Sequence, residues 1–187
     1  MRRCAVALVH HPVLDGQGSI VTSAVTNLDV HDLSRTARTY GASDYFIVHP
    51  IAAQRELVER IRQHWTDGSS GRRIPDRREA LTLLRVVDSL EGALDSLGGR
   101  EQVDVWVTAA RNLGPTLSFA AARTRLEGDG KPVLMVFGTG WGLAPSVVAG
   151  ADALLEPIRA ARGEYNHLSV RSACAIAMDR LLGAKTA

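Results

Sequence analysis

The sequence predicts an α/β fold with a mainly parallel sheet. The first observation is an apolar run at residues 133–137, which a proline precedes and a glycine-rich segment follows. A strand that is apolar at every position is buried on both faces, as in a parallel sheet covered by helices. The second observation is that further short apolar runs alternate along the chain with segments of helical periodicity. Together they favour a six-stranded sheet with helices on both faces.

The composition is that of one domain spanning residues 1–187, because 45% of the residues are hydrophobic and 22% are charged. The formal net charge is only +2, so charge alone does not indicate general binding to polyanions. Cys4 and Cys174 lie in apolar segments, which is typical of reduced core cysteines in an intracellular protein. No apolar run approaches the roughly 20 residues that span a bilayer, and the first run is too short for a signal peptide. The expected location is the cytoplasm.

The N-terminal part begins with a buried strand at residues 4–9, which ends before Pro12 because proline cannot continue a central strand. A long loop is expected up to about Thr26. Asn27 is then a candidate cap for the first helix, since its side-chain oxygen can accept a hydrogen bond from the first helical turn. Gly41 suits the other end of that helix.

A second strand and a second helix follow. Residues 45–48 are apolar and are stopped by Pro50, and residues 53–65 carry apolar side chains at helical spacing. The next stretch, residues 66–74, is rich in Gly, Ser, Asp and Arg and predicts a mobile loop.

The middle of the chain repeats the alternation. Residues 80–87 are apolar enough for a third strand, and residues 90–97 predict a helix that stops at two glycines. A fourth strand is expected at residues 103–107. Pro115 fits the first turn of a helix that would run to Ala122.

The last part of the chain holds the fifth strand, at residues 133–137, and a helix that starts at residues 143–148. A short sixth strand is expected at residues 152–158, where a proline ends it. Ser169 is a candidate cap for the final helix. The apolar stripe of that helix is dominated by small residues, which permit close approach either to its own sheet or to a second subunit.

Three loops are expected at the carboxyl ends of the late strands, at residues 108–112, 138–143 and 155–168. Parallel strands place these loops at one edge of the sheet, where α/β proteins bind ligands, so one pocket is predicted. Glycines at alternating positions of the second loop allow positive φ and the close approach of a ligand, although a tight turn needs glycine for its geometry as well.

Asn27, His31 and Arg35 are spaced by four residues and form a polar row on the first helix. The row is a candidate site. Its spacing also fits a cap followed by an ordinary solvated face.

Several common ligand sites are excluded. The dinucleotide fingerprint G-x-G-x-x-G follows the first strand of its unit, whereas this chain has G-x-G-x-G late in the sequence. A P-loop ends in Gly-Lys-Ser/Thr, but Gly130-Lys131 is followed by Pro132. The six histidines show no ligand spacing with cysteine or carboxylate, so no metal is indicated.

Four segments resemble those of the SPOUT superfamily of S-adenosylmethionine-dependent RNA methyltransferases, and the similarity covers nearly the whole chain. Within it, the chain is most similar to a small bacterial subfamily that is sometimes fused to the tRNA guanine-N1 methyltransferase. The segments that carry the resemblance are residues 26–41 (TNLDVHDLSRTARTYG), 75–81 (PDRREAL), 137–143 (FGTGWGL), and 156–158 through 165–172 (EPI and YNHLSVRS).

The resemblance implies a C-terminal trefoil knot, a homodimer and S-adenosylmethionine as the cofactor, which leaves as S-adenosylhomocysteine. Such a cofactor has no phosphates, which suits a glycine loop without a P-loop lysine. The implied cofactor-binding residues are Thr108, Ala109, Phe137, Gly138, Thr139, Gly140, Trp141, Gly142, Leu143, Leu155, Glu156, Pro157, Ile158, Asn166, His167 and Leu168.

The resemblance also implies catalytic roles for the first helix. Arg35, on a helix opened by Asn27, would orient an RNA phosphate or help to activate the nucleophile, and His31 or His167 would serve as base for a ring nitrogen. The glutamate usual in the glycine motif of ribose methylating members is absent, so the target in tRNA or rRNA stays open between a ribose 2′-oxygen and a base nitrogen. Candidate RNA contacts are Arg72, Arg73, Arg77 and Arg78. No aromatic stacking platform for single strands is visible.

Two alternatives remain at this point. The chain would be an RNA-binding or regulatory module that keeps the S-adenosylmethionine pocket without its own catalysis, or a nucleotide-dependent oxidoreductase. The first is distinguished by methyl transfer to RNA, and the second by nicotinamide binding.

Overall fold

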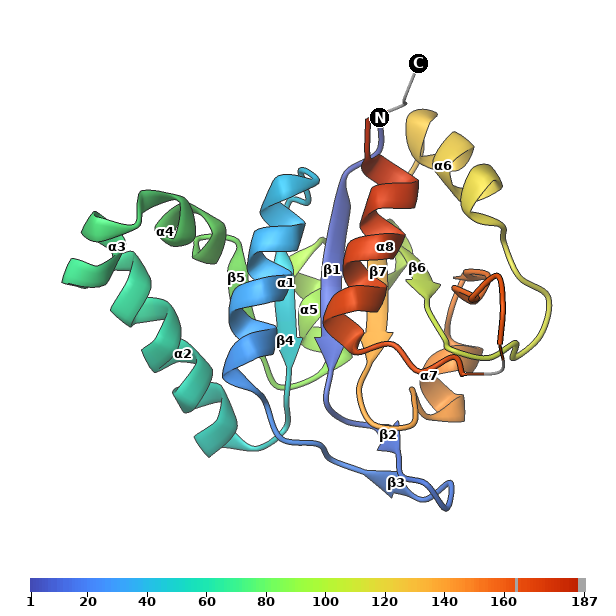
Figure 1. The fold of residues 1–187 in the computed structure, drawn as a ribbon, viewed down its shortest axis with the longest axis horizontal. Helices are drawn as coiled ribbons and strands as arrows, with labels where there is room; N and C mark the ends of the chain where they lie inside the picture. Colours follow the sequence, from blue (N-terminus) through green and yellow to red (C-terminus); the bar gives the residue numbers. More distant parts are fainter. Residues whose placement is uncertain (164, 185–187) are drawn as a thin grey trace.

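The computed structural model describes residues 1–163 and 165–184, and its centre is a six-stranded sheet in the order β5-β4-β1-β7-β6-β8 (Figure 1). Every adjacent pair of strands is parallel. The prediction of a mainly parallel six-stranded sheet is therefore confirmed. The strands are β1 (Cys4–Val9), β4 (Tyr45–Val48), β5 (Leu84–Val87), β6 (Asp104–Val107), β7 (Val133–Gly138) and β8 (Ala153–Leu154).

The central pair of strands positions the functional end of the molecule. All six residues of β1 are buried, as are the first five of β7, because helices cover both faces of the sheet. The two strands pair in register from Cys4 with Val133 to Val9 with Gly138. His10 and Thr139, which follow the last pair, therefore leave the sheet side by side.

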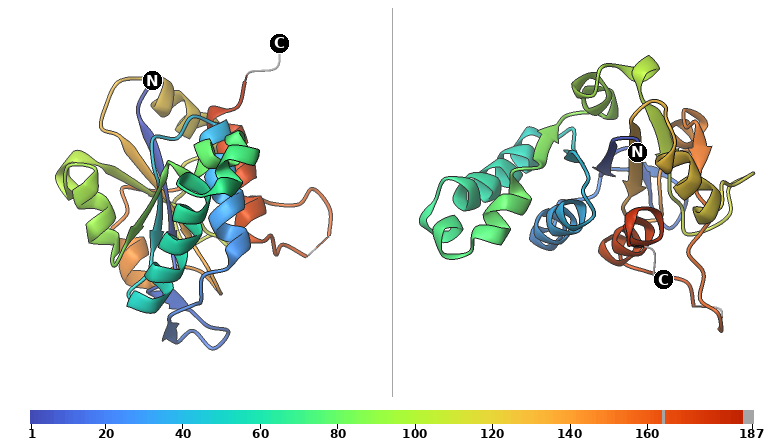
Figure 2. Two further views of the ribbon diagram at one scale, coloured as in Figure 1. Left: turned by 90° about the vertical axis from the view of Figure 1, so that its left-hand side faces the viewer. Right: turned by 90° about the horizontal axis from the view of Figure 1, so that it is seen from above.

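Helices cover both faces of the sheet, as predicted (Figure 2). One apolar core joins the first face of the sheet to α1, α2, α4, α6 and α8, and a second joins the other face to α5 and α7. The helices are α1 (Asn27–Thr39), α2 (Ala52–Thr66), α3 (Ser69–Arg73), α4 (Pro75–Leu81), α5 (Leu90–Ser96), α6 (Phe119–Glu127), α7 (Pro145–Ala149) and α8 (Val170–Leu182), with a 3-10 turn at Arg100–Gln102.

The caps of two helices differ from the prediction. The cap of α1 is Thr26, whose hydroxyl accepts a hydrogen bond from the Asp29 amide at 3.2 Å, and Asn27 is an exposed residue of the first turn. The predicted helix at Pro115 starts later, because Ser118 caps α6 by accepting from the Ala121 amide. The Ser169 cap of α8 is confirmed.

The region before β5 is more helical than predicted. The expected loop at residues 66–74 contains α3, and the first part of the expected strand at residues 80–87 belongs to α4. Pro75 at the first helical position and Asp76 in the first turn favour the start of α4. The strand is therefore reduced to β5.

Other differences from the prediction concern short strands. The expected long loop before Thr26 contains a two-stranded hairpin of β2 (Val13–Leu14) and β3 (Ile20–Val21). The sixth strand, expected at residues 152–158, is only β8, which pairs with β6 over two residues.

The core holds both cysteines as free thiols, Cys4 in β1 and Cys174 in α8. Burial raises the pKa of each thiol to about 12, so both are protonated at neutral pH. Ala177 of α8 is buried in the same core, so this small residue packs against its own sheet, whereas Ala173 is half-buried and lines a cavity. In the described part of the chain, no helix has the length and apolar character needed to cross a membrane.

Candidate functional site

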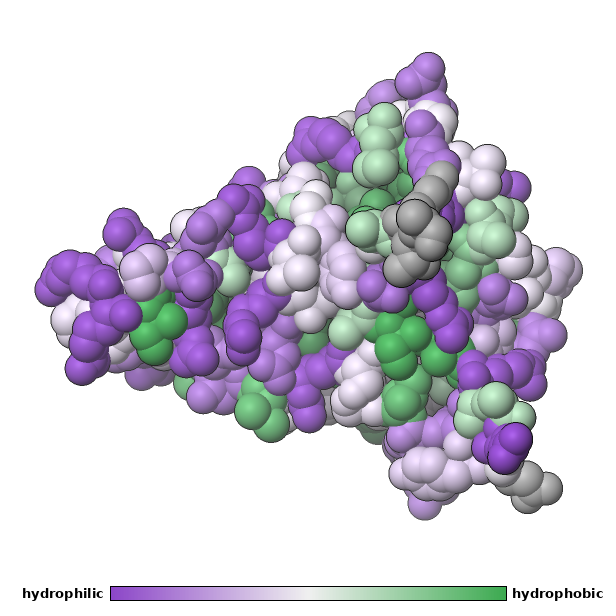
Figure 3. Space-filling view, turned by 45° about the horizontal axis from the view of Figure 1, so that its top comes forward, coloured by the Kyte–Doolittle hydropathy of each residue, from purple (hydrophilic) through white to green (hydrophobic). Residues whose placement is uncertain are grey.

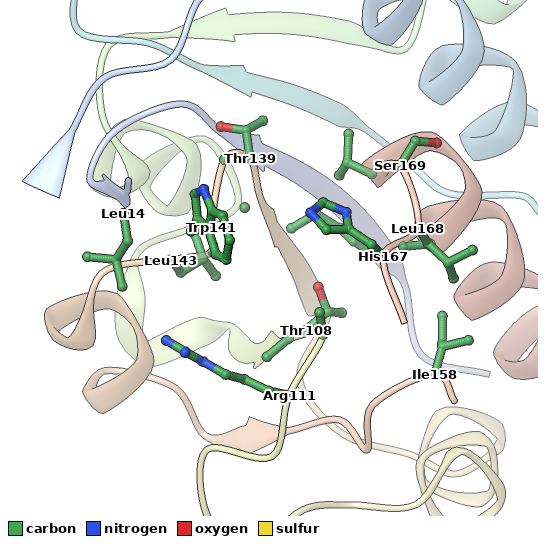
Figure 4. A pocket seen from close by; sticks show the side chains of 18 of the residues that line it. Leu14, Thr108, Arg111, Thr139, Trp141, Leu143, Ile158, His167, Leu168 and Ser169 are labelled. Atoms are coloured by element: carbon green, nitrogen blue, oxygen red, sulfur yellow. The ribbon is translucent and has the colours of Figure 1, made fainter. Parts of the chain in front are cut away.

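A cavity of about 1020 Å³ opens at the carboxyl ends of β6 and β7 (Figure 4). The three loops predicted to meet there do so, and each contributes to the wall: Thr108 from the first, Thr139 from the glycine loop and Ile158 from the third. The segment between β3 and α1 and the first turns of α8 complete the wall. Parallel strands bring these segments to one edge, although they are far apart in the sequence.

The glycine loop is held by the β2–β3 hairpin. The Trp141 amide donates to the Leu14 carbonyl at 2.9 Å, and the Leu14 amide donates to the Gly142 carbonyl at 2.8 Å. Gly140 has φ of 59°, and a Cβ there would lie 2.8 Å from the Leu14 carbonyl oxygen. Gly142 has φ of 111° with open space where its Cβ would be. The contact with the hairpin therefore requires glycine at position 140. At Gly142 the space beside the backbone is open.

A partly buried series of hydrogen bonds reaches the pocket wall from the end of β1. Nδ1 of His10 lies 2.9 Å from Oγ of Ser23, and Oγ of Ser23 is hydrogen-bonded to the Thr139 hydroxyl. The Thr139 hydroxyl donates to the Val9 carbonyl, so it accepts from Ser23, and Ser23 in turn accepts from a protonated Nδ1 of His10. This series of hydrogen bonds links the end of β1 to the glycine loop and to the segment before α1.

Burial, with a smaller contribution from His49, lowers the pKa of His10 to about 4. His10 is therefore neutral at pH 7, and its Nε2 has no hydrogen-bond partner among the described residues. The neighbouring His49 donates from Nε2 to the Ser23 carbonyl at 2.9 Å. Sequence reasoning missed this pair; the signal was a histidine directly after each of two neighbouring buried strands.

An ion pair forms another part of the wall. Nη1 of Arg171 donates to Oδ1 of Asp29 at 2.9 Å, and Nε of Arg171 lies 3.6 Å from Oδ2 of Asp32. The side chain of Asp29 is only 5% exposed. Arg171 lay inside a segment that carried the family resemblance, but the sequence assigned no role to it or to Asp29.

Most residues expected at the cofactor line the cavity; Leu155 and Pro157 do not. Leu155 is buried in the core, and its backbone bridges to Leu117. Glu156 lines the cavity and accepts a hydrogen bond from the Phe119 amide at 2.7 Å. The expected residues that line it are Thr108, Ala109, Phe137, Gly138, Thr139, Gly140, Trp141, Gly142, Leu143, Glu156, Ile158, Asn166, His167 and Leu168.

The polar row of α1 lies outside this cavity. Asn27 and Arg35 are exposed, and neither lines its wall. His31 is half-buried against the edge of the Trp65 ring, with centroids 5.5 Å apart, and burial and the charge of Arg77 lower its pKa. The structure therefore does not bring these three residues to the pocket of their own chain.

The four candidate RNA-contacting arginines lie on α3 and α4, at the end of the molecule beyond α2 (Figure 1). Figure 3 shows that hydrophilic residues dominate this arm. Arg72, Arg73 and Arg78 are exposed, whereas Arg77 packs over the Trp65 ring at 4.7 Å from its centroid. None of the four lines the cavity. Within residues 1–163 and 165–184, no cluster of three His, Cys, Asp or Glu side chains suits a metal.

Comparisons with known proteins identify the family of this chain. A family model described as SAM-dependent RNA methyltransferase matches residues 3–183. The chain is 45% identical over 184 residues to the tRNA (guanine-N(1)-)-methyltransferase of Nitratidesulfovibrio vulgaris Hildenborough, a match that covers 97% of this chain and 42% of that protein. It is 37% identical over 179 residues to an uncharacterized protein of Aquifex aeolicus, covering 94% of this chain and 86% of that protein.

Among solved structures, TrmJ from Z. mobilis ZM4 superposes with a TM-score of 0.64 at 20% identity, over 97% of this chain and 69% of that chain. This likeness concerns the fold. The chain spans less than half the length of the Nitratidesulfovibrio protein.

The predicted resemblance to S-adenosylmethionine-dependent RNA methyltransferases is thus confirmed by the family model, and the likeness to TrmJ confirms the α/β fold. The family depends on S-adenosylmethionine, which confirms the expected cofactor and argues against a nicotinamide-dependent oxidoreductase. The matched residues include both the glycine loop and the ion pair on the pocket wall, and the chain belongs to the SAM-dependent RNA methyltransferase family.

Proposed function

We propose that this chain transfers a methyl group from S-adenosylmethionine to tRNA. The observation that carries the proposal is the cavity at the carboxyl ends of β6 and β7, which gathers the expected cofactor residues except Leu155 and Pro157. The name of the Nitratidesulfovibrio relative favours tRNA over rRNA. The proposed target atom is a base nitrogen or a ribose 2′-oxygen.

The cavity suits S-adenosylmethionine in size and chemistry. Its volume is at the upper end of the range for small-molecule sites, about 300–1,000 Å³, and Phe137, Leu143 and Ile158 give it apolar walls. The cofactor carries a positively charged sulfonium and an ammonium group. Asp29 and Glu156 place two carboxylates on the wall, and a carboxylate accepts several hydrogen bonds, so Glu156 keeps capacity beyond its bond to Phe119.

When bound, S-adenosylmethionine supplies an activated methyl group. The chain's own contribution is positioning, because a preorganised geometry lowers the barrier of an in-line transfer. The hydrogen bonds from His10 through Ser23 to Thr139 hold the glycine loop, and the Arg171–Asp29 pair holds another part of the wall.

The proposal includes a homodimer. Arg35 and Asn27 are exposed on α1 and do not reach the pocket of their own chain, so catalytic roles for them require a second copy. Leu28, which is 59% exposed on the same helix, is an apolar side chain that such an interface would cover. His31 lies in the same polar row of α1 and would face the pocket of the second copy as well.

The proposal also includes a C-terminal trefoil knot, a single domain and a cytoplasmic location. After β8 the chain passes the loop that follows β6: the Glu156 amide donates to the Leu117 carbonyl at 3.0 Å, and Nδ2 of Asn166 donates to the Ala110 carbonyl at 3.1 Å. It then returns to α8, which packs beside α1 (Figure 1). This crossing and return support threading, and one continuous sheet supports a single domain.

For RNA, we infer contacts from Arg72, Arg73 and Arg78, whose exposed guanidinium groups suit phosphates. These contacts lie far from the pocket and would set the orientation of a long substrate. Arg77 contributes to the same arm, although its ring contact with Trp65 restrains it.

A second candidate function is a module that binds S-adenosylmethionine and RNA without catalysis. The observation that favours it is the position of Asn27, His31 and Arg35 outside the cavity. It differs from the first function only in the absence of methyl transfer.

The test combines calorimetry with a transfer assay. S-adenosylmethionine and S-adenosylhomocysteine are titrated into the purified chain, and tritiated methyl transfer to total tRNA and to rRNA is measured. Binding together with transfer to tRNA supports the enzyme. Binding of cofactor and tRNA with no transfer supports the module, and no cofactor binding overturns both.

A further inference from the structure

Three aromatic side chains form a row from the mouth of the cavity into solvent. The rings of Trp141 and His167 meet edge to face with centroids 6.2 Å apart, and those of His167 and Tyr165 are stacked with centroids 6.4 Å apart. Trp141 and His167 line the cavity (Figure 4). Tyr165 is not among the lining residues. The row therefore starts at the pocket and continues beyond it.

The row is strongly exposed. Trp141 is 63% exposed and Tyr165 is 82% exposed, although large aromatic side chains are usually mostly buried. The sequence did not predict a stacking platform, because its rings come from two separate loops. Only the fold brings these loops to the same side of the pocket.

The platform is held in place before any ligand arrives. A Cβ at Gly16 would lie 3.3 Å from two atoms of the Trp141 indole, so the hairpin backbone packs against this ring. The Trp141 amide donates a hydrogen bond to the Leu14 carbonyl. Asn166, which lies between Tyr165 and His167 in the sequence, donates from Nδ2 to the Ala110 carbonyl. Such preorganisation reduces the entropy lost on binding.

Arginines near the row suit a polyanion. Arg111 lines the same cavity and makes no ion pair with any residue in the described part of the chain. Arg159 and Arg162 are exposed on the segment that leads to Tyr165. Guanidinium groups bind phosphates, and aromatic rings stack with bases.

We propose that Trp141, His167 and Tyr165 form a stacking platform for unpaired bases of the RNA substrate. This inference rests on the proposed function and narrows its substrate to RNA whose target lies in a loop, a bulge or an end. In a regular duplex the base faces are stacked on their neighbours and cannot reach the rings. A continuous row from pocket to solvent would hold the target base at the mouth and its neighbour on Tyr165.

The test uses the full chain and a fluorescently labelled RNA hairpin with an unpaired loop. A blunt duplex of the same stem serves as the control RNA, and affinity is followed by fluorescence anisotropy. We expect the hairpin to bind about tenfold more tightly than the duplex. Equal affinity for the two would overturn the platform.

The matched variants are Tyr165→Ala and Tyr165→Phe. Tyr165→Ala is expected to weaken hairpin binding about fivefold or more, because base–aromatic stacking is lost, while Tyr165→Phe keeps most of the affinity. Affinity for S-adenosylmethionine, measured by calorimetry, should stay the same in both, because Tyr165 lies outside the cavity. Trp141→Ala and Trp141→Phe form a second pair, in which the loss of RNA affinity should exceed any loss of cofactor affinity.

The outcomes separate this inference from the proposed function. If the parent methylates tRNA but Tyr165→Ala binds the hairpin normally, the platform is wrong and the enzyme assignment stands. If the parent binds no cofactor but hairpin binding depends on the rings, the platform stands and the enzyme assignment fails. Equal losses of cofactor and RNA affinity, or a change of oligomeric state in Tyr165→Ala by light scattering, would assign the rings to the cofactor or to a second copy and overturn the platform.

Discussion

Nη1 of Arg171 lies 2.9 Å from Oδ1 of Asp29, and this ion pair joins the first turn of α8 to the first turn of α1. The carboxylate of Asp29 is almost fully buried, whereas the Arg171 side chain is 30% exposed. A buried carboxylate is costly unless it is paired and hydrogen-bonded. The pair therefore both stabilises the fold and shapes one wall of the pocket.

Arg171→Ala should lower the free energy of unfolding by about 2 kcal/mol, because it leaves the Asp29 carboxylate buried without its ionic partner. The measurement is urea denaturation. In an Asp29→Asn background the same change should cost clearly less, since no charge is left unpaired. Arg125→Ala, an exposed arginine on α6, is the control and should change stability by less than about 0.5 kcal/mol. Equal costs for Arg171→Ala in both backgrounds would show that the pair does not couple.

Gly140→Ala should abolish binding of S-adenosylmethionine or weaken it at least tenfold, because a Cβ there would lie 2.8 Å from the Leu14 carbonyl oxygen and displace the glycine loop. The measurement is calorimetry. Gly41→Ala is the matched control, since Gly41 also has positive φ, of 72°, but has no atom within 4 Å of its Cβ position. If both variants bind the cofactor equally well, the loop does not form the cofactor site.

Stability should fall as the pH is lowered from about 6.5 to about 4. The unfolded His10 takes up a proton near pH 6.5, whereas burial keeps the pKa of the native side chain at about 4. The unfolded state therefore binds more protons in this window, which costs up to about 1.4 kcal/mol for each pH unit. The lowered pKa values of His31 and His49 act in the same direction.

Urea denaturation at several pH values measures this effect. His10→Gln should show a shallower pH dependence than the parent, and His11→Gln, which alters an exposed neighbour, should keep the parent's slope. If the free energy of unfolding of His10→Gln varies with pH as steeply as that of the parent, His10 is not the group that titrates.

Arg35→Ala should reduce methyl transfer roughly 100-fold while leaving the affinity for S-adenosylmethionine intact, because Arg35 lies outside the cavity and would act by positioning RNA. Arg125→Ala is again the control. Mixing Arg35→Ala chains with Gly140→Val chains should restore part of the transfer if each site draws on two copies. No restoration, with both variants folded and dimeric, would place Arg35 and the glycine loop in the same copy.

The arginines of α3 and α4 should differ in whether their substitution affects stability or tRNA binding. Arg77→Ala should lower the free energy of unfolding by about 0.5–1 kcal/mol, because the guanidinium packs over the Trp65 ring. Arg72→Ala should leave stability unchanged but weaken tRNA binding and reduce its salt dependence, since its side chain is exposed. An unchanged salt dependence in Arg72→Ala would remove this arm from the RNA interface.

Local sequence was sufficient for the central strands β1 and β4, because burial on both faces leaves an apolar run that few other structures require. Residues 4–9 and 45–48 were predicted with the bounds that β1 and β4 have in the structure. It was less sufficient at helix starts. Thr26 and Asn27 are both good capping residues, and the choice between them depends on the path of the chain entering α1.

What the sequence by itself determined is the alternation of strands and helices and the glycine loop that follows β7, since both depend on the polarity and conformational freedom of neighbouring residues. The tertiary structure alone decided which distant side chains meet. The Arg171–Asp29 pair and the chain from His10 through Ser23 to Thr139 each join segments that no local pattern relates. The row of Trp141, His167 and Tyr165 was likewise assembled by the fold, because parallel strands bring the ends of separate segments to one edge of the sheet.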